Sequence, residues 1–384
     1  MPGTAMPDES GPREHSDEDG QFMAEAVRLA ELGRGWVEPN PMVGAVIVRD
    51  GGQLAAGYHR RFGGSHAEIE ALRAAREHGA EVAGATMYVS LEPCCHSGKT
   101  PPCTDAIIAA RLARVVVAMC DPDAKVSGRG IEALRAAGVR VDLGVGQKEA
   151  RRLLAAYVQL REQGRPWVIC KWAQTADGFL GLPPSAGRWI SRGESRQFVH
   201  RLRGEVDGIL VGIGTVLADD PLLTNRSGAG KQPARVVLDS RLRLPPESQL
   251  ASSAAVSQVI AAATAAGLAQ AGAAAERLGR KGVNILAVPA DGRGDVELPA
   301  LLDELGRRQW TYLLVEGGPA VLAAFIDAHL ADELLVFVSA SKAPPGGKDL
   351  PHFDVAELHA RLGLGPGRAV RLGSDTLLRW VLNG

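Results

Sequence analysis

The sequence has few aromatic residues and no excess of either charge. Phe, Trp and Tyr make up 4% of the 384 residues, and 43 basic residues face 44 acidic ones, which gives a net charge of −1. A protein that binds a polynucleotide usually carries a basic excess for the phosphates and aromatic side chains on which bases stack. We therefore expect a small-molecule substrate and no nucleic-acid partner.

The chain also shows no clear export or membrane segment. Residues 1–20 have no apolar core of the signal-peptide kind, and their acidic, polar composition predicts a disordered tail. Ser, Gln, Gly and the pair Glu276–Arg277 interrupt the Ala-rich run 251–278 too often for a spanning helix. We expect a cytoplasmic protein with no membrane contact, and the sequence leaves a homo-oligomer open.

Alternating apolar periodicities predict an α/β fold in two domains. Helical spacing in 22–32 is followed by two extended runs around Asp50–Gly51, which predict a β-hairpin. The stretch 162–168, with its Gly, Pro and charges, is the best candidate for a linker, so we expect a disordered tail at 1–20 and domains at 21–164 and 165–384. Beyond the linker the expected strands are 168–173, 208–211, 235–238, 283–288, 312–315 and 333–338, with helices between most of them.

Three of the five cysteines lie in the stretch LEPCCHSGKTPPC, residues 91–103. An odd, clustered set argues against a disulfide framework and for a reducing compartment with a metal or a reactive thiol. His66, Cys94 and Cys103 offer one imidazole and two thiolates, which leaves the fourth tetrahedral position of a zinc ion for water. Glu68 follows His66 by two residues and is placed to act as a general acid and base.

Two other interpretations of these residues remain open. The cluster could form a structural zinc site, although such a site normally has four protein ligands and no need of Glu68. The adjacent pair Cys94–Cys95 could be a redox feature, but we expect Cys95 to be packed and His96 to face a substrate pocket.

The first half resembles a known enzyme family. The pattern HAE…EPCCHSGKTPPC is similar to the cytidine-deaminase-like zinc fold. Over residues 22–145, the stretches PNPMVGAVIVRDGG and VSLEPCCHSGKTPPCTDAI resemble the deaminase domain of the bifunctional riboflavin-biosynthesis deaminase/reductase family. The resemblance implies an α/β/α domain in which Asn40, His96 and Lys99 bind the substrate. The stretch DPDAKVSGRGI, residues 121–131, departs from the family pattern.

The second half carries weaker motifs when each is taken alone. The stretch 211–221 has a Gly-x-Gly without the third glycine of a dinucleotide-binding fingerprint. In 313–325 a predicted strand, then Glu316 and two glycines, leads into a helix whose amides favour a phosphate. Taken alone, the first stretch is a tight strand-to-helix turn, and a structural turn explains the second as well as a phosphate site does.

In their order, CKWAQTADGF, RWIS, VGIGTVLADDPLLTNR, ARVVLDS and VEGGPAVLAAF resemble the reductase domain of the same family. The resemblance implies a dihydrofolate-reductase-like α/β domain that uses NADPH. The implied cofactor contacts are Gln174, Trp189, Thr215, Asp219, Ser240, Gly318, Pro319, Ala320, Val321, Leu322, Ala323 and Ala324. The implied substrate contacts are Gly187, Arg203, Leu223, Arg226 and Glu316. Gln174, Gly187 and the stretch 341–353 depart from the usual family residues.

The family resemblance implies two successive reactions. Hydrolytic deamination of 2,5-diamino-6-(5-phosphoribosylamino)pyrimidin-4-one would use zinc and Glu68, and NADPH would then reduce the ribosyl chain to give 5-amino-6-(5-phosphoribitylamino)uracil. We expect two chemically independent sites. The alternatives are a deaminase with a non-functional reductase half, a nucleic-acid-editing deaminase, and a non-catalytic protein with a structural zinc.

Overall fold

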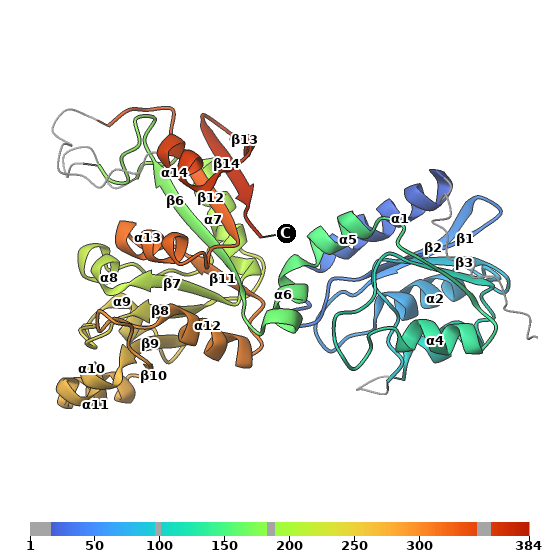
Figure 1. Cartoon of the computed structure of the whole chain (residues 1–384), viewed down its shortest axis with the longest axis horizontal. Coiled ribbons are helices and arrows are strands. Elements are labelled where there is room, and N and C mark those ends of the chain that lie inside the picture. Colours follow the sequence, from blue (N-terminus) through green and yellow to red (C-terminus); the bar gives the residue numbers. More distant parts are fainter. Residues whose placement is uncertain (1–16, 97–100, 183–188, 344–354, 384) are drawn as a thin grey trace, which may run out of the picture. The chain divides into compact units, whose positions relative to one another are not determined.

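A computed structural model describes residues 17–96, 101–182, 189–343 and 355–383. The contacts divide the chain into two compact units (Figure 1). The first comprises Met1–Gly33 and Met42–Leu153, and the second comprises Arg34–Pro41 and Leu154–Gly384. Each unit has its own sheet.

The sheet of the first unit has five strands in the order β2-β1-β3-β4-β5. β1 (Gly44–Arg49) pairs antiparallel with β2 (Gly52–Tyr58) and with β3 (Thr86–Val89), whereas β3, β4 (Arg114–Val117) and β5 (Arg140–Leu143) are parallel. Asp50 and Gly51 join β1 to β2 with φ of 50° and 73°. Two positive φ values suit the right-handed twist of a two-residue hairpin, so the predicted hairpin is confirmed.

Helices cover both faces of this sheet (Figure 1). On one face, α2 (Ala67–Glu77), α3 (Cys103–Ala109) and α4 (Arg129–Ala136) bury their apolar residues against the inward side chains of all five strands. On the other face lies α1 (Asp17–Ala30), where the ring of Phe22 is 5.3 Å from that of Tyr88, and α1 contacts α5 (Gln147–Leu153). The result is the predicted α/β/α layering.

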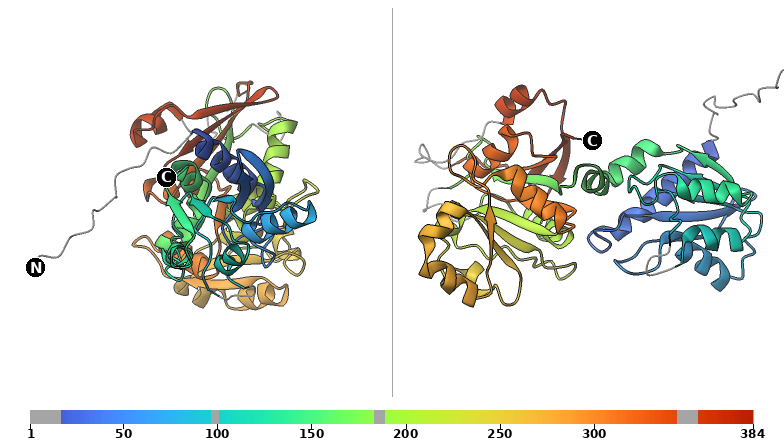
Figure 2. Two further views of the ribbon diagram at one scale, coloured as in Figure 1. Left: turned by 90° about the vertical axis from the view of Figure 1, so that its right-hand side faces the viewer. Right: turned by 60° about the horizontal axis from the view of Figure 1, so that its bottom comes forward.

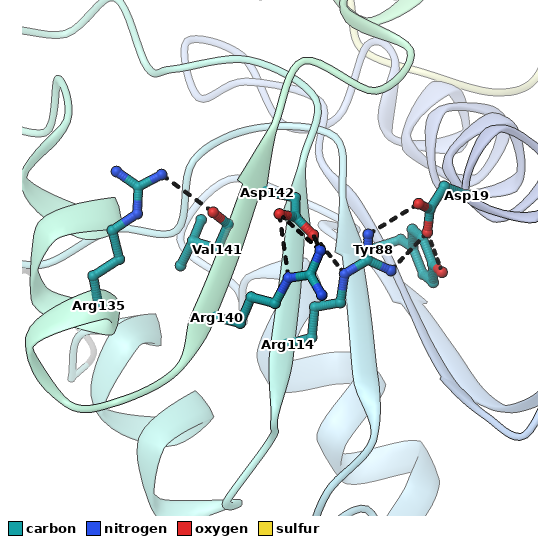
Figure 3. Close-up of polar contacts among 7 residues, drawn as sticks. All are labelled: Asp19, Tyr88, Arg114, Arg135, Arg140, Val141 and Asp142. Carbon is teal, nitrogen blue, oxygen red and sulfur yellow. Dashed lines mark hydrogen bonds and ion pairs between the residues drawn. The ribbon is translucent and has the colours of Figure 1, made fainter. Parts of the chain in front are cut away.

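A network of charges fastens α1 to the sheet (Figure 3). Arg114, the first residue of β4, donates two hydrogen bonds to Asp19, at 2.8 and 2.9 Å, and one to Asp142 at 2.6 Å. The Tyr88 hydroxyl donates to Asp19 at 2.8 Å, and Arg140 pairs with Asp142 at 3.0 Å. Forked guanidinium–carboxylate contacts of this kind satisfy a buried charge, because both partners are hydrogen-bonded.

The second unit contains a nine-stranded sheet in the order β10-β9-β8-β7-β11-β6-β12-β14-β13. The strands from β10 to β12 are parallel, and the antiparallel strands β14 and β13 complete one edge. Figures 1 and 2 show β10 (orange) and β13 (red) at opposite edges. The bounds are β6 Trp167–Gln174, β7 Gly208–Gly212, β8 Ala234–Leu238, β9 Val259–Thr264, β10 Asn284–Val288, β11 Tyr312–Val315, β12 Glu333–Val338, β13 Arg368–Leu372 and β14 Asp375–Val381.

Successive residues of the central strands enter two different cores. Ile209 and Leu314 pack on one face with residues of α7, α8, α9, α10 and α11, whereas Leu210 and Leu313 pack on the other with α12, α13 and α14. Strands buried on both faces explain the continuous apolar runs. The bounds are α7 Gly193–Glu205, α8 Ile213–Asp219, α9 Gln249–Ser252, α10 Ala265–Ala271, α11 Ala273–Arg280, α12 Leu298–Arg307, α13 Pro319–Asp327 and α14 Val355–Leu362.

The Ala-rich run differs most from the sequence-based expectations, because its centre is a strand. β9 pairs with β8 and β10, and all six of its residues are buried. Burial on both faces and two pairing partners outweigh the low strand preference of alanine. The structure also adds β5, β13 and β14, which the sequence patterns did not reveal.

The expected linker at 162–168 lies inside the second unit. The helical stretch before it is divided at Leu154 into α5 and α6 (Ala155–Gln163), and the boundary between the units falls there. Gly164 ends α6 with φ of 71°, and β6 begins three residues later. Within the described ranges, no helix has both the length and the apolar character that crossing a bilayer requires.

One glycine tests the packing of α12 on the end of α6. A Cβ at Gly306 would lie 1.7 Å from the carbonyl oxygen of Gly164, whereas a Cβ at Gly279 in α11 would meet nothing within 4 Å. We expect Gly306→Ala to lower the free energy of unfolding by about 1–3 kcal/mol, because backbone must move. Gly279→Ala should be neutral or stabilising by up to about 1 kcal/mol. Thermal unfolding of both variants checks this, and equal melting temperatures would contradict it.

Candidate active sites

Three ligand atoms converge at the carboxyl end of β3. His66 precedes α2 as its N-cap, Cys94 follows β3, and Cys103 is the first residue of α3. The Nδ1 atom of His66 lies 3.5 Å from the Sγ of Cys94 and 3.3 Å from the Sγ of Cys103, and all three atoms lie within 4.8 Å of one another. Ligand atoms around a tetrahedral zinc ion are roughly 3.4–3.8 Å apart, so these residues fit zinc.

The two thiols are strongly coupled. A hydrogen bond from the Cys103 thiol lowers the pKa of Cys94, and the same contact with Cys94 raises the pKa of Cys103. The hydrogen bond to Cys94 also raises the pKa of His66. The pair therefore favours the thiolate at Cys94, and a bound cation would favour the loss of the second proton.

Glu68 lies in the first turn of α2 and is 3% exposed. Burial raises its pKa to about 6, opposed by the charge of His66. A carboxyl group that titrates near neutral pH can both accept and donate a proton, which suits the general acid–base role predicted for it.

His59 belongs to this site but was not found from the sequence. It follows β2, is 3% exposed, and its ring centre lies 5.4 Å from that of His66. The Nδ1 atom is 2.8 Å from the carbonyl oxygen of Ser65, and burial lowers the pKa of the ring, which favours the neutral form. A single histidine in GYHRR has no spacing pattern, so only its position reveals it.

Three of the remaining four residues expected at or near the deaminase site lie within the described ranges. Cys95 is half-buried and His96 is exposed, whereas Lys99 lies outside the described residues. Asn40, whose backbone N–H donates to the carbonyl of Val37 at 2.9 Å, belongs to the segment Arg34–Pro41, which the contacts assign to the second unit. Its expected role in substrate binding stays a prediction.

In the second unit, several expected cofactor residues follow the carboxyl ends of adjacent parallel strands. α8, with Thr215 and Asp219, follows β7, Ser240 lies just beyond β8, and Gly318 is the N-cap of α13 after β11. A Cβ on Gly318 would lie 3.5 Å from the Oγ1 atom of Thr215. The starts of α8 and α13 therefore lie close together, and backbone N–H groups at helix N-termini favour phosphate groups such as those of a dinucleotide.

α13 carries most of the remaining residues expected to contact the cofactor. Leu322 is 1% exposed and packs in the core, and Val321 touches the space over Gly212 and Gly317. The rest of the expected set, Pro319, Ala320, Ala323 and Ala324, lies on the same helix. Two further expected cofactor contacts lie outside α13. Trp189 is exposed, and the Arg196 guanidinium lies 5.4 Å from its ring centre. Gln174 is buried and accepts a hydrogen bond from Trp172 at 2.8 Å.

Glu316 lies between two cations. It follows β11 and accepts hydrogen bonds from Arg203 at 2.7 and 3.0 Å and from Lys171 on β6 at 3.1 Å. Although burial opposes ionisation, the charges of Lys171 and Arg203 lower the pKa of Glu316 to about 2. Lys171 was not among the expected residues; it stands inside the quoted stretch CKWAQTADGF.

Arg203 and Arg226 have different surroundings. Arg203 is nearly enclosed by Glu316 and by the carbonyl of Thr224, to which it donates at 3.2 Å. Arg226 is exposed, and its backbone N–H donates to His200 at 3.3 Å. Leu223, with φ of 53°, is buried in the same loop, and Gly187 lies outside the described residues.

Two family profiles match the chain, one in each unit. The profile described as "Cytidine and deoxycytidylate deaminase zinc-binding region" matches residues 16–119, and "RibD C-terminal domain" matches residues 166–341. The fold and the sites therefore define a protein with a zinc-binding deaminase domain and a reductase domain. The expected cytidine-deaminase-like and dihydrofolate-reductase-like folds are confirmed.

Relatives and solved structures agree over nearly the whole chain. Riboflavin biosynthesis protein RibD of Aquifex aeolicus is 39% identical over 94% of this chain and 97% of its own length, and that of Escherichia coli is 37% identical over 84% and 88%. Acinetobacter baumannii RibD aligns with a TM-score of 0.76 and 31% identity over 95% of this chain and 98% of its own. A diaminohydroxyphosphoribosylaminopyrimidine deaminase/5-amino-6-(5-phosphoribosylamino)uracil reductase from Thermotoga maritima aligns with a TM-score of 0.75 and 33% identity. The alignment covers 94% of this chain and 98% of that structure's chain.

The chain belongs to the RibD family, the bifunctional deaminase/reductases of riboflavin biosynthesis. It is thus both a hydrolase and an oxidoreductase. The nucleic-acid-editing deaminase, the deaminase with an inactive second half and the purely structural zinc protein are not favoured.

The ligand set makes a direct prediction about metal content. We expect about one zinc ion per chain, and Cys103→Ser should lose it, because Cys103 supplies one of the three converging donors. Cys95→Ser should retain zinc. Metal analysis of the purified variants checks this; loss of zinc from Cys95→Ser with retention in Cys103→Ser would contradict the ligand assignment.

The ion pairs of Glu316 predict a pH-dependent contribution to stability. The pKa falls from an ordinary value of 4.5 to about 2 on folding, so the stabilisation is complete at neutral pH and is lost as the pH falls from about 4.5 towards 2. Glu316→Gln should cost about 3 kcal/mol at pH 7, since it leaves Lys171 and Arg203 without a counter-charge. The deficit should shrink on acidification in urea unfolding measured from pH 7 to 3.

A surface carboxylate provides the control. Glu304 pairs with Arg307 and Arg308 on its own helix, at 3.0 and 2.9 Å, and such pairs contribute about 0.2–1 kcal/mol. Glu304→Gln should therefore have a small effect at every pH. An equally small effect of Glu316→Gln at pH 7 would show that Glu316 is not the counter-ion of this cluster.

Proposed function

We propose that the first unit hydrolyses the amino group of 2,5-diamino-6-(5-phosphoribosylamino)pyrimidin-4-one and that the second reduces the product with NADPH to 5-amino-6-(5-phosphoribitylamino)uracil. The observation that carries the proposal is the convergence of His66, Cys94 and Cys103 beside buried Glu68, in a chain of this family. We assign the deaminase to residues 21–164 and the reductase to 165–384. The deaminase profile matches 16–119, which begins five residues before the first range, and the reductase profile matches 166–341, which lies inside the second.

In the deaminase, zinc when bound supplies the Lewis acidity that makes water nucleophilic at neutral pH. His66, Cys94 and Cys103 would hold the ion. Glu68 would take a proton from the attacking water and deliver it to the amine that leaves, and its pKa of about 6 lets it do both. His96 and Lys99 would bind the pyrimidine and its phosphate, with Asn40 as a further contact.

In the reductase, NADPH when bound supplies the hydride. Thr215, Ser240 and the N-terminus of α13 would hold the cofactor, with Trp189, Asp219 and Gln174 at its edges. Glu316 is ionised at neutral pH, so it would accept hydrogen bonds from substrate amino groups rather than donate a proton.

We assign the substrate phosphate to Arg226. The Arg203 guanidinium already serves Glu316 and Thr224, so it would orient Glu316, while exposed Arg226 stands beside His200. Burial lowers the pKa of His200, and the charges of Arg203 and Arg226 lower it further. Two nearby cations favour the binding of an anion such as phosphate. Leu223 and Gly187 would complete the substrate contacts.

The chain requires a compartment that keeps Cys94 and Cys103 reduced if they are to bind zinc. We therefore propose a cytoplasmic location, since disulfides rarely persist there. The choice between NADPH and NADH is tested by following the oxidation of each with the deaminated substrate, and a preference for NADH would overturn the cofactor assignment.

Paired variants of the full chain test the two reactions separately. Glu68→Gln should keep zinc and reduce ammonia release by about 10²–10⁴-fold, yet reduce the deaminated substrate at the original rate. Arg226→Ala should raise the Michaelis constant of the reduction about 10–100-fold, because a charge-assisted phosphate contact contributes about 1.5–3 kcal/mol, and should spare ammonia release. Deamination at the wild-type rate in Glu68→Gln, or its loss in Arg226→Ala with the fold intact, would refute the assignment.

A further inference from the structure

Glu92 is a buried carboxylate without a side-chain role in the reaction described above. It stands two residues before Cys94, just beyond β3, and is 3% exposed. Its Oε1 accepts hydrogen bonds from the backbone N–H groups of Gly130 at 2.8 Å and Ile131 at 3.3 Å. Its Oε2 accepts from those of Gly128 at 2.9 Å and Asp121 at 3.2 Å.

These donors come from both ends of one segment. Asp121 follows β4, whereas Gly128 is the N-cap of α4 and Gly130 and Ile131 lie in its first turn. The carboxylate therefore holds the whole connection from β4 to α4, and the positive end of the α4 dipole favours its charge. This connection is the stretch 121–131 that departs from the family pattern.

The backbone on both sides of the contact fits closely. A Cβ on Gly130 would lie 2.1 Å from the carbonyl oxygen of Pro93 and 3.1 Å from Oε1 of Glu92. The backbone N–H of Glu92 donates to the carbonyl of Met119 at 3.0 Å. Residues 92 and 93 are thus fixed between the end of β4 and the start of α4.

Cys94 is held from its other side by α3. The backbone N–H of Thr104 donates to the Cys94 carbonyl at 3.2 Å, and that of Cys103 lies 3.4 Å from its Sγ. The position of the Cys94 sulfur therefore depends on α3 on one side and, through Glu92 and Pro93, on α4 on the other. A thiolate displaced by a few tenths of an ångström changes the geometry of the metal it binds.

We propose that Glu92 is a positioning residue for deamination: its carboxylate joins the α4 N-terminus to the turn that carries Cys94, and so sets the metal-ligand geometry. The inference rests on the proposed zinc-dependent deamination. The hydrogen bonds of the Glu92 carboxylate go to backbone N–H groups of the segment 121–131. Glu92 therefore acts on the reaction indirectly, by fixing the backbone that leads to Cys94.

The test replaces Glu92 by its isosteric amide in the full chain. Each carboxylate oxygen serves two donors, so in Glu92→Gln either orientation of the new side-chain amide would point its NH₂ group at two backbone N–H groups. With Co²⁺ in place of zinc, we expect shifted thiolate-to-cobalt and ligand-field absorption bands. At full metal loading, kcat for ammonia release should fall by about 10–100-fold.

Asp19→Asn is the matched control. Asp19 is also buried and accepts hydrogen bonds from Arg114 and Tyr88 (Figure 3). Arg114 pairs with Thr86, the first residue of β3, whereas Glu92 follows the last residue of that strand. Asp19→Asn should lower the melting temperature while leaving the cobalt spectrum and kcat unchanged. A merely structural Glu92 would behave in the same way, and that result would overturn the proposal.

A second variant covers the case in which Glu92→Gln does not fold. Gly130→Ala keeps the carboxylate but forces the α4 turn away from Pro93, and it should shift the cobalt spectrum in the same direction. A wild-type spectrum and kcat in a folded Gly130→Ala would also overturn the proposal. The spectrum requires no substrate, so failure of the wild-type protein to release ammonia would refute the proposed function without deciding the role of Glu92.

Discussion

The deaminase site depends on the close fit between the chain just beyond β3 and the first turns of two helices. Cys103 opens α3 and lies against Cys94, while Gly130 in α4 leaves no room for a side chain over Pro93. Parallel strands bring such connections to one edge of a sheet, and here that edge also receives His66 and Glu68 from α2. The metal ligands are therefore supplied by separate elements whose packing, more than any single bond, fixes their separation.

The two units use buried carboxylates in opposite ways. Burial dominates at Glu68 and moves its pKa to about 6, where proton exchange is easy. The Glu316 side chain is also largely enclosed, but Lys171 and Arg203 move its pKa to about 2, where it stays charged. Burial alone thus does not decide what a carboxylate can do; the neighbouring charges decide it.

Much of the architecture could be predicted because its patterns are local. The hairpin at Asp50–Gly51, the helix after His66 and the apolar strands of the second half each have a periodicity or a turn that a short window reveals. β9 could not be predicted in this way, because six small or apolar residues match a buried strand and a buried helix equally well. The division between the units was also hidden, since the contacts of Arg34–Pro41 and α6 are long-range.

The same limit applies to the sites. The convergence of His66, Cys94 and Cys103 could be predicted because two clustered cysteines and a histidine with a glutamate two residues later, Glu68, form a combination typical of a zinc site. His59, Lys171 and Glu92 could not, because a histidine, a lysine or a glutamate in sequence gives no sign of burial or of its partners. Glu92 in particular looks like any surface acid until four backbone N–H groups are found around it.

The strand order of the second unit has a consequence for how the chain is made. β7, β8, β9 and β10 are neighbours in sequence order, but β6 pairs only with β11 and β12, which are synthesised much later. During translation, β6 leaves the ribosome with both edges unpaired and with an apolar surface that has no cover. β11 must then enter between β7 and β6 to unite the sheet. Such non-local pairing slows folding and prolongs the exposure of an apolar, aggregation-prone strand. We therefore expect the nascent reductase to depend on chaperones more than the deaminase does.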